Sequence, residues 1–374
     1  MSWPKVKLRN LIVANYGKAL KKEDRDENGH CSVFGSAGSV GFHAESLIDI
    51  QTIVVGRKGS VGKIIWAPNG GWIIDTAYYL TLIGDVSLDW RYLYYALQVA
   101  NLGQKTITTS IPGLNRDDFY ETEIPLPPLE EQKHIAAILD KADAIRQKRK
   151  QAIELADEFL RSVFLDMFGD PVSNPKGWEV KSLAELCDGK LQNGAYFPKD
   201  AYSEEGVEMV HMGDAFYDYI PRGKMKRVLA SSKDIEKYAV TGDDILISRR
   251  SLNYEGAAKP SLIMSSDEPL LFESSLIRFR PVSFILNKSY MFGYLSNETV
   301  KEQKIRKYVT GATIKGISQK NLEKVEVLVP PIAFQNRYEL VVNNIGKLKK
   351  KLCSEGEFDL MFNALSQKAF SGQL

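Results

Sequence analysis

Hydrophobic residues in the middle of this chain recur at steps of three and four. Across residues 130–168, from Ile135 to Val163, they alternate in this way with Lys, Arg, Asp and Glu. This spacing predicts an amphipathic α-helix of about 38 residues, about 57 Å long at 1.5 Å per residue. A proline-rich run precedes the helix, and the sequence GDP from Gly169 ends it.

A second amphipathic pattern lies near the end of the chain. Because the first helix is too long for one small domain to cover, we expect the two helices to pack against each other, antiparallel if a pseudo-twofold relates them. Two independent surface helices are the alternative. The sequence SEG from Ser354 interrupts the apolar stripe and predicts a local break. The stripe consists of Tyr338, Val341, Ile345, Leu348 and Leu352, and then Phe362, Leu365 and Ala369.

Short runs with β-strand composition dominate the chain before residue 129. They cover residues 52–55, 63–66 and 78–83, and glycine-rich turns separate them. Aromatic and aliphatic residues at helical spacing predict a helix over residues 90–101. We therefore expect an α+β fold with a strongly bent mixed sheet in this part of the chain.

The borders of the long helices are repeated. The run IPLPPLEEQ from Ile124 recurs as VLVPPIAFQ from Val327, and upstream of it SIPGL from Ser110 corresponds to TIKGI from Thr313. Each proline-rich run is followed by one of the two amphipathic patterns. The second copy departs from the first at Phe334, where the first has Glu131. This is a duplication of one unit and not a short-period repeat array.

The strand-rich parts are repeated only in outline. Trp3 corresponds to Trp178, with a leucine five residues later in both, and residues 52–57 correspond to 244–249. Elsewhere the two parts differ widely. A chain with two copies of one unit suits a target with two halves, such as duplex DNA read at two half-sites. The expected division is residues 1–128, a helix over 129–170, residues 171–331, and a helix over 332–374.

Composition limits the other functional classes. The chain has 374 residues, a net charge of +2, and 26% charged residues, which is ordinary for a globular protein. No apolar run is long enough to span a membrane and no secretory signal is present, so the expectation is a cytoplasmic protein without a membrane partner. Three scattered cysteines and four scattered histidines favour neither a disulfide framework nor a metal site.

The doubled pattern resembles the specificity subunit of Type I restriction-modification systems. PLPPLEEQKHI from Pro125, FLDMFGDP from Phe164 and NPKGW from Asn174 look like the limits of that family's central conserved region. The resemblance implies two globular α/β target-recognition domains, each reading one half of a bipartite asymmetric DNA sequence. They are separated by two long conserved helices that form an antiparallel coiled coil with pseudo-twofold symmetry.

The resemblance also implies partners and a role for the helices. The helices act as a spacer and dock methyltransferase (modification) subunits, normally two, and restriction (motor-nuclease) subunits join the complex. The specificity subunit itself carries no catalytic residue, cofactor or metal.

The residues agree with the absence of a catalytic site. The methyltransferase motif that holds a flipped adenine is not present, because Leu126 and Val329 precede the Pro-Pro pairs. The run from Gly56 to Lys63 resembles a phosphate-binding loop, but its glycine spacing is wrong and Ile64 follows the lysine. A glycine-permitted turn near a phosphate backbone is the better interpretation. Asp243 and Asp244 suggest a turn before a buried strand more than a nuclease site.

Three kinds of segment are candidates for DNA contact: the turn after the shared strand, the polar stretch before each proline-rich run, and a basic run in the second globular part. Arginine can read guanine, asparagine can read adenine, and hydroxyl and lysine groups suit phosphates. For each residue the alternative is a solvated surface side chain. The candidates are Arg57, Lys58, Ser60, Lys63, Lys105, Thr108, Thr109, Ser110, Arg222, Lys224, Lys226, Arg227, Arg249, Arg250, Asn253, Tyr254, Lys307, Thr310, Thr313 and Lys315.

The sequence therefore predicts a non-catalytic DNA sequence-specificity subunit. A self-contained metal-dependent DNA-processing enzyme is the first alternative. A scaffold with two degenerate domains, binding any duplex with an affinity governed by salt, is the second.

Overall fold

The computed structural model describes residues 3–100, 102–105, 113–352 and 355–374. It divides into two compact units. The first unit contains residues 1–151 and 353–374, and the second contains residues 152–352. None of the helices in the described part of the chain is long and apolar enough to cross a membrane.

The predicted long helix is confirmed as α3 (Leu129–Phe168), which has 40 residues. Glu130 and Glu131 lie in its first turn, where the helix dipole favours negative charge. Its first half belongs to the first unit and its second half to the second unit. The predicted second helical pattern forms α8 (Ile332–Lys351) and α9 (Glu355–Phe370). The predicted break is confirmed, although Gly356 itself lies inside α9.

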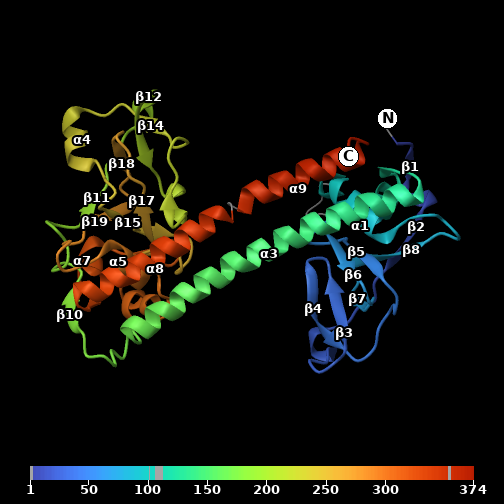
Figure 1. The fold of residues 1–374 in the computed structure, drawn as a ribbon, viewed down its shortest axis with the longest axis horizontal. Helices are drawn as coiled ribbons and strands as arrows, with labels where there is room; N and C mark the ends of the chain where they lie inside the picture. Colours follow the sequence, from blue (N-terminus) through green and yellow to red (C-terminus); the bar gives the residue numbers. More distant parts are fainter. Residues whose placement is uncertain (1–2, 101, 106–112, 353–354) are drawn as a thin grey trace. The chain divides into compact units, whose positions relative to one another are not determined.

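Both shorter helices pack antiparallel to α3, as predicted (Figure 1). In the first unit, Arg146 of α3 donates a hydrogen bond of 3.0 Å to Asp359 of α9, and its guanidinium lies 4.7 Å from the Phe362 ring centroid. In the second unit, the Lys349 ammonium of α8 lies 2.7 Å from Asp157, and the rings of Phe164 and Tyr338 meet edge to face at 5.5 Å.

Besides a two-stranded ribbon, the described part of the first unit holds two larger sheets, where the sequence suggested a single bent mixed sheet. That expectation is wrong for the main sheet, whose order β2-β8-β5-β6 is entirely antiparallel. Only the smaller sheet, β4-β3-β7, is mixed. The strands are β2 (Ile12–Tyr16), β3 (Cys31–Gly35), β4 (Gly38–His43), β5 (Thr52–Gly56), β6 (Ile64–Ala67), β7 (Trp72–Ile73) and β8 (Ala77–Leu82).

Two short helices cover this sheet region. The helix predicted over residues 90–101 is α1 (Trp90–Val99), and its Tyr92, Leu93 and Tyr95 are buried with β2, β5 and β8 in one core. α2 (Arg116–Tyr120) contributes Phe119 to the same core. One-turn 3-10 helices occur at Leu8–Asn10, Lys22–Asp24 and Leu102–Lys105.

The second unit has a five-stranded sheet in the order β11-β19-β15-β17-β13, in which only β13 and β17 are parallel. A second sheet has the order β14-β12-β18. The strands are β11 (Gln192–Asn193), β12 (Tyr202–Val210), β13 (Tyr219–Ile220), β14 (Arg227–Val228), β15 (Ile245–Ser248), β16 (Arg250–Ser251), β17 (Pro260–Ile263), β18 (Leu270–Phe272), β19 (Leu276–Phe279) and β20 (Lys315–Gly316).

The helices of the second unit surround these sheets. Besides α8, they are α4 (Ser232–Tyr238), α5 (Lys288–Ser296), α6 (Glu298–Val300) and α7 (Gln319–Leu322), with a π-helix at Lys301–Ile305 and 3-10 turns at Lys199–Ala201, Asp214–Phe216 and Arg306–Tyr308.

The repeated tryptophan segments form the same local structure in each unit. β1 (Lys5–Lys7) pairs antiparallel with β9 (Glu123–Pro125), and β10 (Glu179–Ser182) pairs antiparallel with β21 (Glu326–Val329). Each two-stranded ribbon joins the beginning of a globular part to the strand that leads into a long helix. The loosely repeated sequence therefore encodes a repeated structural connection.

A buried glutamine fixes the start of each long helix. The Gln132 side chain accepts a hydrogen bond from the Asp89 backbone N–H (2.8 Å) and donates to the carbonyl groups of Ser87 and Pro127 (3.2 and 2.9 Å). It is 1% exposed. These three hydrogen bonds join the helix to the N-terminus of α1, to the loop before α1 and to the proline-rich run.

Gln335 repeats this arrangement in the second unit. It accepts from the Asn287 backbone N–H (2.8 Å) and donates to the carbonyl groups of Ile285 and Pro330 (2.9 and 2.7 Å). A buried tyrosine hydroxyl completes each connection, since Tyr92 donates to the Pro125 carbonyl (2.6 Å) and Tyr290 to the Leu328 carbonyl (2.8 Å). We call Gln132 and Gln335 the glutamine clamps.

Part of the predicted apolar stripe is exposed. The sequence placed Phe159 in the core with Phe164, Met167 and Phe168, but Phe159 is 51% exposed. Ile145 and Leu348 are also exposed, while Phe164 and Phe168 are buried. The stripes on the helices are wider than one antiparallel neighbour can cover, so each helix pair keeps apolar surface facing outward.

We predict that Gln132→Ala lowers the urea midpoint of the first unit, corresponding to a loss of about 2–4 kcal/mol, because it leaves one backbone donor and two carbonyls without partners. Gln151→Ala, at an exposed position of the same helix, is the control. Equal midpoints for the two variants would show that the clamp does not stabilise the fold.

Candidate nucleic-acid interface

In the first unit, the turn after the shared strand pairs with residues 113 and 114, which follow the second predicted DNA-contact segment, most of which lies outside the described residues. The Arg57 carbonyl after β5 accepts a hydrogen bond of 2.9 Å from the Leu114 backbone N–H, and Lys58 forms a β-bridge with Gly113. The Arg57 N–H donates to the Thr76 carbonyl at 2.9 Å. The turn after the shared strand is thus tied to the segment that precedes α2.

The corresponding two segments come together in the second unit. The Arg249 carbonyl accepts from the Ile317 N–H (3.0 Å), and the Arg249 N–H donates to the Ser275 carbonyl (2.8 Å). Arg250 pairs with Gly316 where β16 meets β20. Backbone hydrogen bonds therefore build equivalent paired loops in both units, although the side chains on them differ. We call these pairs, residues 57–58 with 113–114 and residues 249–250 with 316–317, the reading loops, after the function proposed for them below.

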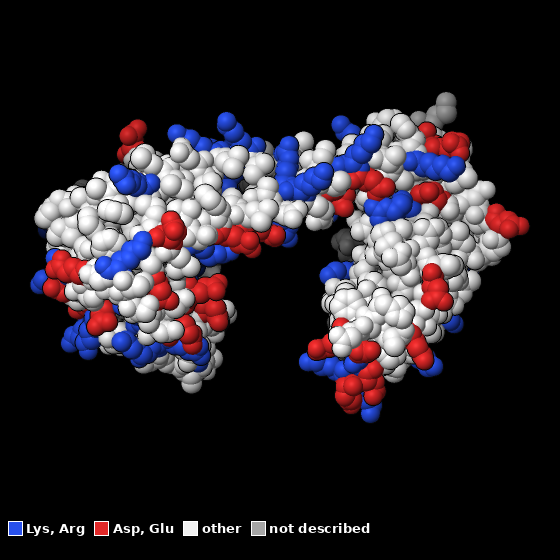
Figure 2. Space-filling view, turned by 60° about the horizontal axis from the view of Figure 1, so that its bottom comes forward, with Lys and Arg blue, Asp and Glu red and all other residues white. Residues whose placement is uncertain are grey.

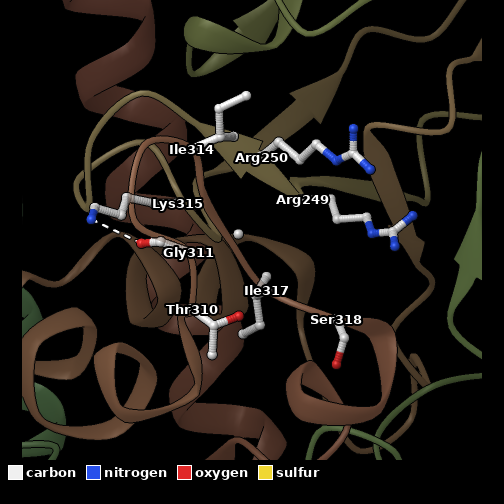
Figure 3. Close-up of a pocket in the computed structure, with 9 residues that line it drawn as sticks. Arg249, Arg250, Thr310, Gly311, Ile314, Lys315, Ile317 and Ser318 are labelled. Atoms are coloured by element: carbon white, nitrogen blue, oxygen red, sulfur yellow. Dashed lines mark hydrogen bonds between the residues drawn. The ribbon is translucent and has the colours of Figure 1, made fainter.

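The reading loops of the second unit line an open cavity of about 360 Å³. Figure 3 shows the guanidinium groups of Arg249 and Arg250 extending to one side, with Lys315 directed to the other. Thr310 and Gly316 exchange two backbone hydrogen bonds of 2.8 Å, which close the loop that carries the exposed Thr313. No carboxylate in the described residues forms an ion pair with Arg249 or Arg250. The Arg249 guanidinium donates one hydrogen bond of 3.4 Å to the Ser274 carbonyl, and its other donors remain for a ligand.

Tyr254, near this cavity, contacts two cationic side chains, Arg306 and Lys315. The guanidinium of Arg306 lies 4.6 Å and the ammonium of Lys315 4.7 Å from its ring centroid. Lys315 also donates to the carbonyl groups of Gly311 and Ala312, at 2.9 and 2.8 Å. The Asn253 side-chain oxygen accepts from Ser251 and from the Gly256 N–H, both at 3.0 Å. Lys315 and Asn253 thus hold the loops in shape.

The predicted basic run of the second unit is partly neutralised. Arg222 donates at 2.8 Å to Glu208, whose side chain is 2% exposed, and Arg227 pairs with Glu268. Such pairs leave little positive charge for an incoming phosphate. Lys224 and Lys226 are exposed and have no ion pair among the described carboxylates, so they are the remaining candidates from this run.

The glycine-rich run of the first unit forms a turn, as predicted. Gly62 donates to the Gly56 carbonyl at 2.8 Å, and Gly59 and Gly62 have φ values of 77° and 74°. A Cβ on Gly62 would lie 2.6 Å from the Gly103 nitrogen, so only glycine fits there. Ser60 and Lys63 are exposed, and Lys63 donates to the Ala37 carbonyl at 2.5 Å.

Some candidates have no described side chain. Thr108, Thr109 and Ser110 lie outside the described residues, and Lys105 is described only through its backbone. Lys307 is exposed, with its ammonium 5.2 Å from the Tyr308 ring centroid.

Charges of both signs are mixed on the face of the molecule that Figure 2 shows, where Lys and Arg lie among Asp and Glu. Asp244, which sequence reasoning weighed as part of a nuclease site, is fully buried and accepts two hydrogen bonds of 2.8 Å from Arg280. No group of three His, Cys, Asp or Glu residues in the described part of the chain is placed to hold a metal ion.

Sequence reasoning missed two residues at the first reading loop. Tyr16, at the end of β2, lies 5.1 Å from the Arg57 guanidinium carbon, and Arg116, at the start of α2, lies at the same distance from the Tyr16 ring. The position of Arg116 two residues after the repeated SIPGL segment was the available signal. Nothing in the sequence around Tyr16 connects it to Arg57.

Both units match one protein family. The model described as type I restriction modification DNA specificity domain matches residues 2–155 and 175–338. The MjaVIII type I restriction enzyme specificity subunit of Methanocaldococcus jannaschii is 26% identical over 332 residues, which are 82% of this chain and 76% of that protein.

Solved structures show the same fold. A type I restriction-modification S subunit from M. genitalium has a TM-score of 0.62 at 18% identity, covering 99% of this chain and 96% of that one. A structure described under complex assembly and conformational transition of the type I R-M system has a TM-score of 0.51 at 19% identity, covering 100% and 98%.

The doubled fold thus defines a protein with two related domains, and the chain belongs to the family of type I restriction-modification DNA specificity domains. It is a specificity subunit with two target recognition domains, which is the recognition part and not the catalytic part of such a system.

We predict that Arg249→Ala weakens binding to the cognate duplex by about 1–3 kcal/mol while binding to a scrambled duplex changes little, because an arginine that reads a base edge contributes to specificity. Titrations at one fixed salt concentration measure both. Lys233→Ala, an exposed charge on α4, is the control. Equal losses on the two duplexes would mean that Arg249 contacts phosphate.

Proposed function

We propose that each unit reads one half of a bipartite, asymmetric DNA sequence through its reading loops. The equivalent backbone pairing of these loops in the two units carries this proposal, because it presents arginines without described acidic partners at corresponding positions on two different domains. The divergence of the surrounding side chains favours different half-sites. We expect the protein to act on this DNA in the cytoplasm.

The proposed contact residues are the loop residues that keep free donors or hydroxyl groups. Arginine forks suit guanine edges, and exposed lysine and hydroxyl groups suit phosphates. Arg222 and Arg227 are left out because acidic neighbours engage them. The proposed set is Arg57, Lys58, Ser60, Lys63, Lys224, Lys226, Arg249, Arg250, Lys307, Thr310 and Thr313.

We infer that α3 acts as the spacer between the half-sites. It is one uninterrupted helix, and its two halves are anchored in the cores of different units through Ile135 and Leu139 and through Phe164 and Phe168. A helix anchored at both ends has little freedom to change its length.

We further propose that the helix pairs dock methyltransferase subunits, two per chain, and that restriction subunits join the resulting complex. The outward apolar residues support this proposal, since Ile145 and Leu340 are exposed in addition to Phe159. In the first unit, Ile145 and Met361 line an apolar groove with Arg146 and Arg149. Exposed apolar surface of this kind is typical of protein interfaces.

We predict that exchanging residues 1–128 for those of a relative changes one half of the methylated sequence and leaves the other half intact. The physical reason is that the two sets of reading loops are built from separate units. Sequencing of methylated sites in DNA exposed to the complex measures the result. A change in both halves, or in neither, contradicts modular reading.

We predict that Phe159→Ser weakens association with a methyltransferase subunit by about 1.5–3 kcal/mol, because a large apolar side chain loses its burial on docking. Glu158→Gln, at an exposed neighbouring position, is the control. Association is measured by calorimetry or light scattering, and DNA binding of the chain alone should not change. Unaltered association removes Phe159 from the docking surface.

A further inference from the structure

The first unit carries an exposed tyrosine flanked by two arginines without acidic partners. Tyr16 is 49% exposed, and the guanidinium carbons of Arg57 and Arg116 each lie 5.1 Å from its ring centroid. Both distances are within the range of cation–π attraction. No carboxylate of the described residues forms an ion pair with either arginine. Their orientation is therefore set by an aromatic ring, and their hydrogen-bond donors are not consumed by acids.

Three separate segments bring these residues together. β2 pairs with β8, which places Tyr16 opposite Tyr78, and β5 on the other side of β8 places Val55 opposite Tyr78. Arg57 follows Val55 by two residues. Arg116 follows Leu114, which is bonded to Arg57, by two residues and begins α2, which Asn115 caps by accepting from the Asp117 N–H at 2.8 Å.

Buried aromatic rings support the Tyr16 ring that contacts the two arginines. The Tyr78 ring packs edge to face against Tyr16 at 5.1 Å and stacks on Phe119 at 6.4 Å. The Tyr78 hydroxyl donates to the Leu114 carbonyl at 3.1 Å. Burial raises the pKa of Tyr78, so its hydroxyl stays protonated and keeps this bond at neutral pH. This hydrogen bond connects Leu114 of the reading loop to Tyr78, which packs against Tyr16.

A guanidinium held in advance in one orientation suits base recognition. Its two parallel donors match the O6 and N7 acceptors of guanine in the major groove, and this bidentate pair distinguishes guanine from the other bases. Because the ring has already restricted the arginine side chains, less conformational entropy is lost when they bind. A lysine at the same place would keep the charge but lose both the fork and much of the stacking.

We propose that Arg57 and Arg116, oriented by Tyr16, read guanine in the half-site of the first unit. This inference rests on the proposed function, namely that the first unit reads duplex DNA. It assigns a specificity role to Arg116, makes Tyr16 a positioning residue, and names the base that the pair recognises.

The second unit contains a similar tyrosine with two cationic neighbours, but both cations already have hydrogen-bond or ion-pair partners. Its Tyr254 also has two cations nearby, but Arg306 is ion-paired with Glu302, and Lys315 donates to two backbone carbonyls. These cations stabilise the loop and have fewer donors left for a base. Guanine reading by arginines held on tyrosine therefore belongs to the first half-site.

The test uses the full chain in complex with methyltransferase subunits and maps methylated sites by sequencing. Arg57→Lys and Arg116→Lys should each lower discrimination for guanine at one position of the first half-site by about 10- to 100-fold, leaving the second half-site unchanged. Tyr16→Leu should weaken discrimination at both positions, whereas Tyr16→Phe keeps the ring and should keep the sequence.

Arg9→Lys is the matched control, because Arg9 belongs to the same unit but is already paired with Glu121. A wild-type first half-site without guanine overturns the inference, as does an unchanged sequence in both lysine variants. Uniformly slower methylation with an unchanged sequence also overturns it, because it identifies phosphate contacts. In each of these cases a bipartite wild-type sequence that follows exchange of residues 1–128 leaves the proposed function standing.

Discussion

The fully buried glutamine at the start of each long helix is the interaction on which the rest of the structure depends. Gln132 and Gln335 each join three backbone groups: the N-terminus of a short helix, the loop before it, and the proline-rich run. A buried amide must have all of these partners, because an unpaired one carries a large desolvation cost. The glutamine therefore fixes the position of the start of the long helix relative to the core of its own unit.

This constraint separates what must stay the same from what can change. The clamps, the tyrosine bonds to Pro125 and Leu328, and the two-stranded ribbons recur in both units. The sheets that they carry differ in strand number and pairing. Because the reading loops close by backbone hydrogen bonds, their side chains can vary without altering the frame. A recognition protein built in this way can acquire a new target sequence while keeping its helices.

The same frame explains the use of charge. The net charge is only +2, and several arginines are paired with acids, including Arg222 and Arg280. The arginines on the reading loops form no ion pair with the described carboxylates: Arg57 rests on aromatic rings, and Arg249 and Arg250 line an open cavity. We therefore propose that recognition depends on the placement of a few donors more than on a strong overall attraction for DNA.

The sequence by itself determined the features that depend on neighbours along the chain. The period of apolar residues predicted α3 and the interrupted second helix, and the duplicated runs predicted the two units. The pairing of Arg57 and Arg249 with their second segments is seen only in the tertiary structure. The tertiary structure decided which groups remain available. Arg222 forms an ion pair with Glu208, and Phe159 is exposed. The main sheet of the first unit is separate from the smaller mixed sheet, and Tyr16 lies near Arg57 across β8. Periodicity reports how a segment folds, whereas strand register and long-range packing decide which side chains meet, and these depend on residues far apart in the sequence.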